Sequence, residues 1–468
     1  MRKLLLMSTI LIMLIGCGNE SVSSIEPEET AVQDIIVEEY DGESVDTYDV
    51  IYTLDKVLTL TFDRILPKEE LLPLLNKLDE HDIQATFFGS HAELTTNPES
   101  VKELIDRGHQ IESNALYGMD MDQLDYDDIY RLVQTTNEQI EEMTGQAPEY
   151  VRIQSKKEQP DVNKIAGQFD MSGVVNFSHQ FKKIDPSNEE ELRQNADRAI
   201  ARGGILSMNP EDTHLLPHVI DSVHKVDFEF ISLNELLDLD QNRKSFQDIT
   251  GADAIQEAMN DTKVEPYLHY QEETDKKEVA LTFDDWASEG VVLEVLDILD
   301  TYDIQSTFYI KTSNVRKNPN LARLLIERGH EVANHSHSHL DSTTLSTEEL
   351  QQDVYQAHKI ITEAIQEQPT LYFRPPFGRI DDESARSITA MGFEALGMYD
   401  ISSYDWNEEY TEADVIERVM TNVQPGSVIV MHILDDIHTP SVLSDLIESL
   451  QKEGYEFVLT SDWIANNS

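Results

Sequence analysis

The sequence is short of cysteine, of basic residues and of long apolar stretches. Of its 468 residues only one is cysteine, Cys17, so no disulfide can form within the chain. Lysine and arginine number 35 against 90 aspartates and glutamates, which gives a net charge of −55. A field of that sign repels phosphate backbones, so we expect no binding to nucleic acid. Beyond the first residues, no stretch approaches the length and apolarity of a membrane span.

Length and composition predict a globular protein of two domains. A chain of 468 residues exceeds what one hydrophobic core usually serves, and its apolar fraction of 40% is ordinary. The surplus of acid is more typical of a solvated surface than of a binding device. Because the Debye length shrinks as salt rises, such a surface would suit saline surroundings, which we keep as a hypothesis.

The first residues have the pattern of an export signal. Arg2 and Lys3 precede an apolar run that is too short to span a bilayer comfortably. The following "LIGC" resembles the lipobox of bacterial lipoproteins, in which cleavage leaves Cys17 as the lipidated first residue. An ordinary signal with an incidental thiol is the alternative, less favoured because a lone exported thiol has no disulfide partner. We expect a signal peptide over 1–16 and membrane contact through Cys17 on the outer face of the cytoplasmic membrane.

The rest of the chain is a tandem repeat. Residues 56–88 run parallel to residues 277–309, with Asp63 facing Asp284 at an offset of 221 (284 − 63). The offset drifts by only two residues across the repeat, as loop insertions would leave it. Each copy alternates short β-branched runs with amphipathic segments, which predicts βα units and a parallel sheet or barrel.

The repeat sets the expected domain boundaries. An acidic, serine-rich segment after the signal is predicted to be a flexible tether, and a mixed polar segment between the copies is predicted to be a linker with at most one short helix. The expected order is tether 17–49, first copy 50–240, linker 241–275 and second copy 276–468.

Acids and histidines follow strand-like runs in the second copy. Asp284 and Asp285 can share a site only where their strand runs out into a loop, and the carboxyl ends of strands are where α/β folds bind ligands. His335, His337 and His339 follow another such run. One carboxylate with two neutral imidazoles leaves positions open on a divalent metal. Helix caps and surface charges are the alternative for each cluster taken alone.

Three further segments complete a pattern. "YFRPPFG" at 372–378 is by itself a rigid turn that contains an arginine, and "SYDW" at 403–406 is by itself a weak signal. "GSVIVMHI" at 426–433 predicts a buried strand whose last polar residue emerges beside the acids.

In this order the segments resemble the polysaccharide deacetylases, carbohydrate esterases with a NodB homology domain. The resemblance covers about 276–465 and includes five motifs: "TFDD", "HSHSH", "RPPF", "SYDW" and "IVMH". It implies an α/β fold, a distorted (β/α) barrel in each copy. It also implies metal-dependent removal of N-acetyl groups from amino sugars, with an acetylated polysaccharide as the partner and no protein partner.

The resemblance assigns roles to residues of the second copy. It makes Asp284 the general base and His432 the general acid, and it implies that Arg374 orients the base while Asp405 favours the imidazolium form of His432. The metal, zinc first and cobalt or nickel as alternatives, would be held by a set of three residues: Asp285, His335 and His339.

Substrate contacts are also implied by resemblance. The backbone N–H of Phe377 would stabilise the oxyanion, and Trp406 and Val430 would line the groove and the acetyl pocket. Trp286 stands where the family usually has glycine, so it could stack on a sugar or narrow the entrance. Two further departures, Ser402 and Ile433, replace residues that are often acidic, which leaves substrate choice open.

The first copy lacks most of this set. The corresponding positions hold residues that cannot bind a divalent metal or act as the acid: Arg64, Asn114, Gly118 and Asn209. Asp63 and Arg152 remain. We expect the same fold without catalysis, in a copy that could position the catalytic domain, bind glycan or serve as a packing partner.

The expected substrate is cell-wall peptidoglycan or another poly-N-acetylglucosamine. An O-acetyl xylan esterase is the alternative within the same chemistry. A glycan-binding or scaffolding lipoprotein is the alternative from a different class, and the complete residue set of the second copy argues against it.

Overall fold

The computed structural model describes residues 37–464 except 155–156, 158, 242 and 258–262. The expected signal peptide, Cys17 and most of the tether lie outside the described residues. Within the described part of the chain, no helix combines the length and apolarity needed to cross a membrane.

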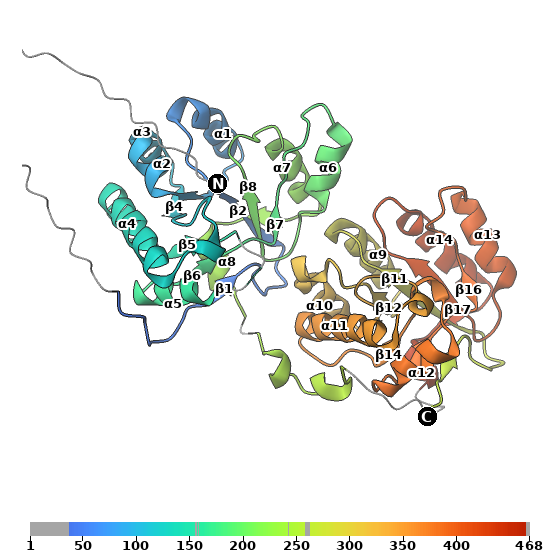
Figure 1. Ribbon diagram of the computed structural model, residues 1–468. Coiled ribbons are helices and arrows are strands. Elements are labelled where there is room, and N and C mark those ends of the chain that lie inside the picture. Colours follow the sequence, from blue (N-terminus) through green and yellow to red (C-terminus); the bar gives the residue numbers. More distant parts are fainter. Residues whose placement is uncertain (1–36, 155–156, 158, 242, 258–262, 465–468) are drawn as a thin grey trace, which may run out of the picture. The chain divides into compact units, whose positions relative to one another are not determined.

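The first copy is built on a nine-stranded sheet in which every strand pair is parallel. Its path runs β1-β6-β5-β4-β3-β2-β8-β7, and β9 also pairs with β2 (Figure 1). The strands are β1 (Thr47–Tyr48), β2 (Val57–Phe62), β3 (Thr86–Gly89), β4 (Gln110–Ser113), β5 (Tyr150–Arg152), β6 (Gly173–Val175), β7 (His179–Gln180), β8 (Gly204–Met208) and β9 (Glu229–Phe230). The helices are α1 (Lys68–Glu80), α2 (His91–Thr96), α3 (Pro98–Asp106), α4 (Tyr126–Thr144), α5 (Pro160–Gln168), α6 (Glu189–Asp197), α7 (Leu216–Lys225) and α8 (Leu233–Asp238).

The second copy repeats this topology strand for strand. Its path runs β10-β15-β14-β13-β12-β11-β17-β16, and β18 also pairs with β11. The strands are β10 (Leu268–His269), β11 (Glu278–Asp285), β12 (Thr307–Ile310), β13 (Glu331–Asn334), β14 (Tyr372–Phe373), β15 (Ala395–Gly397), β16 (Ile401–Ser402), β17 (Val428–His432) and β18 (Glu456–Phe457). The helices are α9 (Glu289–Thr301), α10 (Pro319–Glu327), α11 (Thr347–Ile365), α12 (Asp382–Ala390), α13 (Glu412–Asn422), α14 (Thr439–Lys452) and α15 (Thr460–Ile464).

Each sheet curls into a distorted barrel with helices around it. An isolated antiparallel bridge, Val50 with Gly204 in the first copy, brings the segment after β1 against β8. Gln271 and Ser427 form the matching bridge in the second copy. The predicted α/β fold of two tandem distorted (β/α) barrels is therefore confirmed.

The central strands are buried on both faces. In β2 and β11 every residue after the first is buried, as the continuous apolar runs of the sequence predict for parallel strands covered by helices. The same aromatic stack lies beneath both sheets: Phe62 with Phe87 at 4.7 Å between ring centroids, and Phe283 with Phe308 at 4.9 Å. The two copies thus share their core chemistry as well as their topology.

Two predicted boundaries need correction. β1 lies inside the predicted tether 17–49, and β10 lies inside the predicted linker 241–275. Each is an edge strand of two residues, too short to show alternation in the sequence, and backbone pairing with β6 or β15 holds it in place. The linker also contains two short 3₁₀ turns, η2 (Phe246–Asp248) and η3 (Ala252–Ala254), where at most one short helix was expected.

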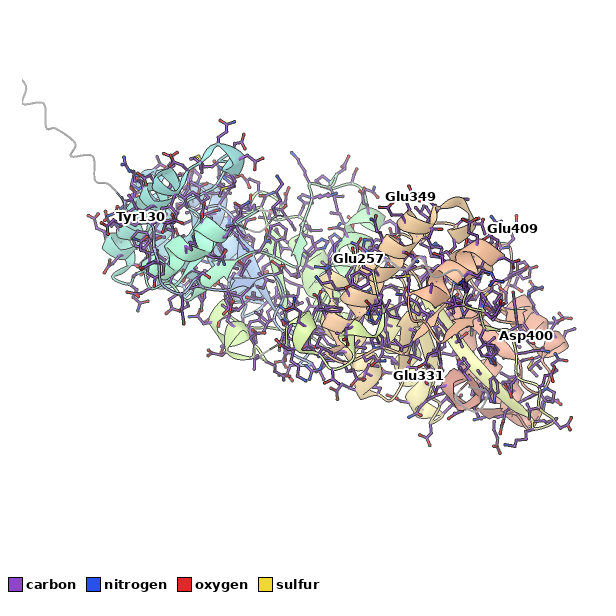
Figure 2. The ribbon with its side chains drawn as sticks, turned by 60° about the horizontal axis from the view of Figure 1, so that its bottom comes forward. Tyr130, Glu257, Glu331, Glu349, Asp400 and Glu409 are labelled. Carbon is purple, nitrogen blue, oxygen red and sulfur yellow. The ribbon has the colours of Figure 1, made fainter. Side chains whose placement is uncertain are left out.

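The acidic surplus is carried on the surface. Glu257, Glu349 and Glu409 are exposed, and Figure 2 shows their positions on the second half of the chain. Glu349 is also bound to the backbone and hydroxyl of Ser346 in a capping box, which begins α11. The acid therefore stabilises helix ends as well as solvating the surface, in agreement with the sequence-based expectation.

We expect Phe62→Ala to lower the free energy of unfolding by about 3–5 kcal/mol, because it removes one ring of a fully buried stack. Urea unfolding followed by circular dichroism would measure the change. Ile105→Ala on the exposed side of α3 is the matched control and should stay within about 0.5 kcal/mol. Equal shifts for the two variants would contradict the assignment of Phe62 to the core.

Candidate functional site

The residues singled out in the second copy meet at the carboxyl ends of strands from the central part of the sheet, where β14, β13, β12, β11 and β17 follow one another. β11 lies between β12 and β17, and its register places Asp284 beside His432. β13 ends at Asn334, one residue before His335. Strand register therefore brings together side chains that are up to 148 positions apart (432 − 284) in the sequence.

Asp285, His335 and His339 form a three-residue cluster suited to a metal. Their ligand atoms all lie within 4.8 Å of one another, and no other such group occurs among the residues that the structure describes. Oδ1 of Asp285 is buried without a hydrogen-bond partner. His335 donates its Nδ1–H to the carbonyl oxygen of Arg374 at 2.8 Å, which leaves its Nε2 lone pair for an ion. The donor set fits a divalent metal such as zinc.

The electrostatics of this cluster also suit a cation. Burial opposes ionisation of Asp285, but the electrostatic interactions with His335 and Lys311 outweigh it and lower its pKa. Burial and the electrostatic interaction with His335 lower the pKa of His339 to about 4. At neutral pH the cluster therefore offers an ionised carboxylate and a neutral imidazole at position 339, which are the protonation states that metal binding requires.

The backbone around the cluster is unusual. Several residues other than glycine adopt the left-handed region there: Asp285 (φ 78°), Ser336 (φ 69°), His339 (φ 58°), Phe377 (φ 60°) and Tyr404 (φ 61°). Such conformations are uncommon for non-glycine residues, and they persist only where the surroundings enforce them. At Asp285 the turn lets two adjacent acids face one site, which an extended strand would forbid.

Asp284 is held by a fully buried arginine. Arg374 donates from Nη1 to Oδ1 of Asp284 at 2.7 Å and also to Thr282 at 2.8 Å. Its remaining donors bind the carbonyl oxygens of Gly397 and Met398. Every contact of the guanidinium thus fixes the direction in which it meets the carboxylate.

Sequence reasoning missed the residues around this arginine. The Arg374 guanidinium lies 3.8 Å from the ring centroid of Tyr309 and 5.5 Å from that of Tyr399. Thr282 could have been found, because it lies two residues before Asp284 and so on the same face of β11. The two tyrosines come from other elements, and no local pattern in the sequence marks them.

His432 and Asp405 form a second buried pair. Oδ1 of Asp405 lies 2.8 Å from Nδ1 of His432, and Oδ2 accepts the backbone N–H of His432 at 2.7 Å. Ser403 and Thr439 donate further hydrogen bonds to this carboxylate. Burial opposes protonation of His432, but the hydrogen bond and charge of Asp405 outweigh it and raise the pKa of His432.

The predicted substrate contacts divide into exposed and buried groups. Phe377 and Trp406 are 59% and 48% exposed, and Phe377 packs edge-on against His339 at 4.8 Å. Trp286 is 8% exposed and belongs to the hydrophobic core cluster, which leaves little indole surface to stack on a sugar. Val430 is buried two residues before His432 on the same face of β17.

Two further polar residues lie near the cluster. Nδ1 of His337 lies 3.0 Å from the hydroxyl oxygen of Thr312, and His337 is not part of the three-residue cluster. Lys311, which sequence reasoning did not single out, directs its Nζ to within 3.4 Å of Oδ1 of Asp285. Its position one residue after β12 is the signal that could have identified it.

The corresponding site of the first copy keeps the buried ion pair and adds a second partner to its carboxylate. Nε of Arg152 lies 3.0 Å from Oδ1 of Asp63, and both side chains are buried. Arg152 also donates to Thr61, as Arg374 does to Thr282. In addition Ser207 donates to Oδ2 of Asp63, and Asn114 donates to its backbone oxygen. The carboxylate is therefore engaged on both oxygens.

The metal position of the first copy holds a guanidinium instead. Arg64 forms ion pairs with Glu93 at 3.0 Å and with Glu211. Gly118 keeps φ at 74°, close to the 58° of its counterpart His339, and nothing lies within 4 Å of where its Cβ would be. At this position the backbone thus keeps the left-handed conformation although the imidazole is gone.

A family model described as polysaccharide deacetylase matches the chain twice, at residues 51–174 and 271–396. Among relatives, a peptidoglycan-N-acetylglucosamine deacetylase of Bacillus cereus is 29% identical over 199 residues, 42% of this chain and 92% of its own length. A peptidoglycan-N-acetylglucosamine deacetylase, PgdA, of Listeria monocytogenes is 32% identical over 39% of this chain and 38% of its own length.

Solved structures with similarity include two proteins of Bacillus. The peptidoglycan deacetylase PdaC of Bacillus subtilis shares 28% identity, with 41% of this chain and 93% of that chain covered and a TM-score of 0.37. A family 4 carbohydrate esterase pseudoenzyme of Bacillus anthracis shares 25% identity, with 43% and 70% covered and a TM-score of 0.40.

We expect one divalent ion per chain, because among the described residues only the second copy has the three-residue cluster. Equilibrium dialysis of the metal-stripped protein with zinc, followed by elemental analysis, would give the stoichiometry. His335→Ala should lower it to nearly zero, whereas His337→Ala, the matched control, should leave it at one. Two ions per chain, or one in His335→Ala, would contradict this assignment.

Proposed function

Because the chain belongs to the polysaccharide deacetylase family, we propose that its second copy hydrolyses the N-acetyl groups of N-acetylglucosamine in peptidoglycan or a related glycan and releases acetate. The names of the relatives in Bacillus cereus and Listeria monocytogenes support this substrate. The observation that carries the proposal is the geometry of the second copy: a held carboxylate, a metal-binding cluster and a histidine of raised pKa lie around the end of β11.

The cluster of Asp285, His335 and His339 would hold the divalent metal. Such an ion, when bound, lowers the pKa of a water ligand toward ~7 and polarises a carbonyl oxygen. The three residues leave coordination positions open for water and substrate, as catalytic sites require. Phe377 lies beside His339, where its backbone N–H would serve the developing oxyanion.

Asp284 would accept the proton of the attacking water. Its Oδ1 is bound to Arg374, and its Oδ2 is directed toward His335 at 3.8 Å, on the side of the cluster. The buried guanidinium fixes the orientation of the carboxylate. One oxygen is thereby held by the fold, and the other is left for proton transfer.

His432 would give a proton to the departing amine. An amide anion is a very poor leaving group, so C–N cleavage needs an acid at the nitrogen. Asp405 stabilises the imidazolium and orients the ring through Nδ1, which leaves the Nε2–H for the substrate. Acid and base stand on paired positions of neighbouring strands.

The first copy would not hydrolyse glycan. Arg64 places a positive charge where the metal ligand stands in the second copy, and a guanidinium repels a divalent cation. Its base equivalent, Asp63, is bound on both oxygens. We further propose that the mature protein acts outside the cytoplasmic membrane, anchored through lipidated Cys17, which the export signal of the sequence supports.

We expect the full chain to release acetate from peptidoglycan or chitooligosaccharides when a divalent metal is present. Asp284→Asn should lower kcat by about 10²–10⁴-fold, because it removes the general base, and should still bind one metal ion. Acetylated xylan serves as the comparison substrate, and preferential release from it would favour the O-acetyl esterase alternative. No release from any substrate with metal present would favour a glycan-binding protein.

The pH dependence of kcat/KM tests the acid. A general acid must be protonated, so activity should fall as pH rises through the pKa of His432, which Asp405 raises. Asp405→Asn removes that stabilisation of the imidazolium, and the alkaline limb should move to lower pH while the acid limb stays.

A control variant separates this effect from general loss of charge. Asp414→Asn removes a carboxylate whose hydrogen bonds come from Thr411, and it should leave both limbs in place. An unmoved alkaline limb in Asp405→Asn would show that His432 is not the acid.

A further inference from the structure

The first copy contacts the second at the loops that follow strands β11 and β17. We propose that it is a positioning domain, whose Arg198 and Arg202 hold the two loops that follow β11 and β17. These loops continue from the proposed base and from the proposed acid, so the inference rests on the proposed function. It gives the copy without a metal site a defined task in the chemistry of its neighbour.

The two catalytic loops are joined to each other. Asp435, three residues after His432, accepts hydrogen bonds through Oδ1 from the backbone N–H of Ser288 at 3.0 Å and from its hydroxyl at 2.7 Å. Ser288 in turn lies three residues after Asp285. We call this Ser288–Asp435 link the loop staple. It couples the loop after the metal ligand to the loop after the acid.

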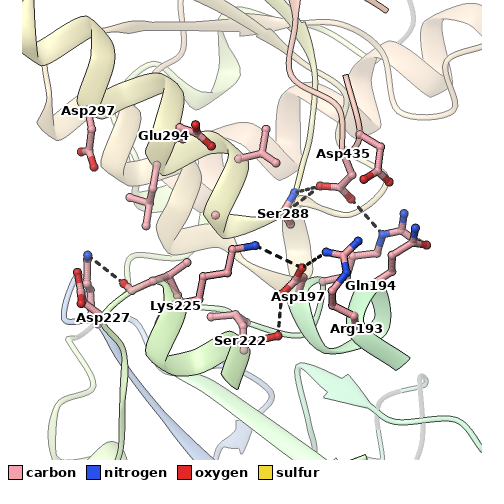
Figure 3. A pocket seen from close by; sticks show the side chains of 18 of the residues that line it. Arg193, Gln194, Asp197, Ser222, Lys225, Asp227, Ser288, Glu294, Asp297 and Asp435 are labelled. Carbon is pink, nitrogen blue, oxygen red and sulfur yellow. Dashed lines mark hydrogen bonds and ion pairs between the residues drawn. The ribbon is translucent and has the colours of Figure 1, made fainter. Parts of the chain in front are cut away.

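Arg198 reaches the loop staple from the first copy. Its Nε lies 3.0 Å from Oδ2 of Asp435, the oxygen that Ser288 does not use. The carboxylate of Asp435 is therefore held from both sides, by its own copy through one oxygen and by the first copy through the other. Figure 3 shows the staple and the dashed contact that continues from Asp435 toward the helical segment of the first copy.

Arg202 holds the residue next to the staple. Its Nε donates to Oε1 of Glu289 at 2.9 Å, and both side chains are almost completely buried. Asn318 donates to the other oxygen of Glu289 at 2.6 Å. Glu289 directly follows Ser288 and begins α9, so this buried pair fixes the start of the helix that carries the loop. Separating Arg202 from Glu289 would leave a buried carboxylate without its cation, which is costly. The ion pair therefore holds Arg202 and Glu289 together.

The backbone of Arg202 is fixed as well. Asn320 of α10 donates to the carbonyl oxygens of Arg202 and Ile51 at 2.7 and 2.8 Å, in a fully buried position. The first copy is therefore tied to the second through both the side chain and the main chain of one residue. Because both the side chain and the carbonyl group of Arg202 are held, a displacement of Arg202 would be passed on to Glu289 and Asn320.

The duplication supplies an internal comparison. The repeat alignment places Lys68 of the first copy opposite Glu289, and that lysine is partly exposed and pairs with Glu103 of its own copy. It places Thr421 and Pro425 of the second copy opposite Arg198 and Arg202. Each half of the contact thus occurs in one copy only, as an asymmetric interface requires.

A cavity of about 560 Å³ lies beside the staple. Helices α6, α7 and α9 contribute to its walls, and Ser288 and Asp435 lie at its edge (Figure 3). Because Ser288 and Asp435 border this cavity, other side chains do not pack against them on the cavity side. On that side of Asp435 the restraining contact is its ion pair with Arg198.

The first experiment compares two arginines of the full chain. Arg198→Ala should lower kcat by up to about fivefold, the worth of a partly exposed ion pair, with KM and metal stoichiometry unchanged. Arg198→Lys should recover part of the loss because it keeps the charge. Arg193→Ala is the matched control: Arg193 lines the same cavity, its ion pairs are with Glu190 and Asp197 of its own copy, and Asp436 of the second copy acts on it only through a weaker charge interaction, so kcat should stay close to the wild-type value.

Amide hydrogen exchange gives a readout that does not depend on activity. Residues 286–289 and 433–438 should exchange faster in Arg198→Ala than in Arg193→Ala. Equal exchange and equal kcat in the two variants would overturn the positioning role. If the wild-type chain released no acetate from any substrate, the proposed function would fail, whereas the exchange comparison would still decide the role of Arg198.

A second pair of variants tests Arg202 without relying on a destabilised protein. Arg202→Met leaves Glu289 buried without its cation and should lower the melting temperature. Arg202→Met combined with Glu289→Met removes the uncompensated charge and should recover the melting temperature. If the pair positions the loop, kcat stays reduced in the double variant; recovery of kcat together with stability would reduce the pair to a packing contact.

Discussion

The buried pair of an aspartate and an arginine is the interaction on which both copies depend. It links the end of β11 to the segment after β14 through Asp284 and Arg374, and the end of β2 to β5 through Asp63 and Arg152. Separating either pair would leave an uncompensated charge inside a barrel, which costs several kcal/mol. The first copy keeps the pair although it has lost the metal cluster. The pair therefore stabilises the fold of both copies, and in the second copy it also holds a residue of the candidate site.

The sequence predicted the parts of the site that lie in short motifs. The strand-end pattern grouped acids with three histidines, the resemblance to polysaccharide deacetylases selected Asp285, His335 and His339 among them, and the structure brings the ligand atoms of these three residues within 4.8 Å. What it could not predict are features set by distant elements. Trp286 was expected at the entrance and lies in the core, and the contacts of Thr439 with Asp405 cross between separate elements. Edge strands of two residues were missed because so short a segment has no period.

The two copies share only part of the backbone conformation around the site of the second copy. At Asp285 the left-handed turn directs a second carboxylate into the site, at a cost that the surroundings must offset. In the first copy Gly118 still adopts the left-handed form at the position of His339, and open space remains around it. Arg64 and Ala115, the counterparts of Asp285 and Ser336, are not left-handed. The first copy therefore keeps only part of the backbone conformation of the site.

The first copy keeps its barrel and its buried ion pair, and these suit it to hold the second copy in position. A copy whose barrel keeps its buried ion pair stays rigid, and a rigid body can restrain a neighbour through few contacts. Arg202 and Asn320 provide buried contacts, and Arg198 extends them to the loop after His432, the proposed acid. Proton transfer needs donor and acceptor within hydrogen-bond reach, so a shift of 1 Å in either loop would slow the reaction. The proposed positioning role would therefore account for a first copy that keeps its barrel without the metal-binding cluster.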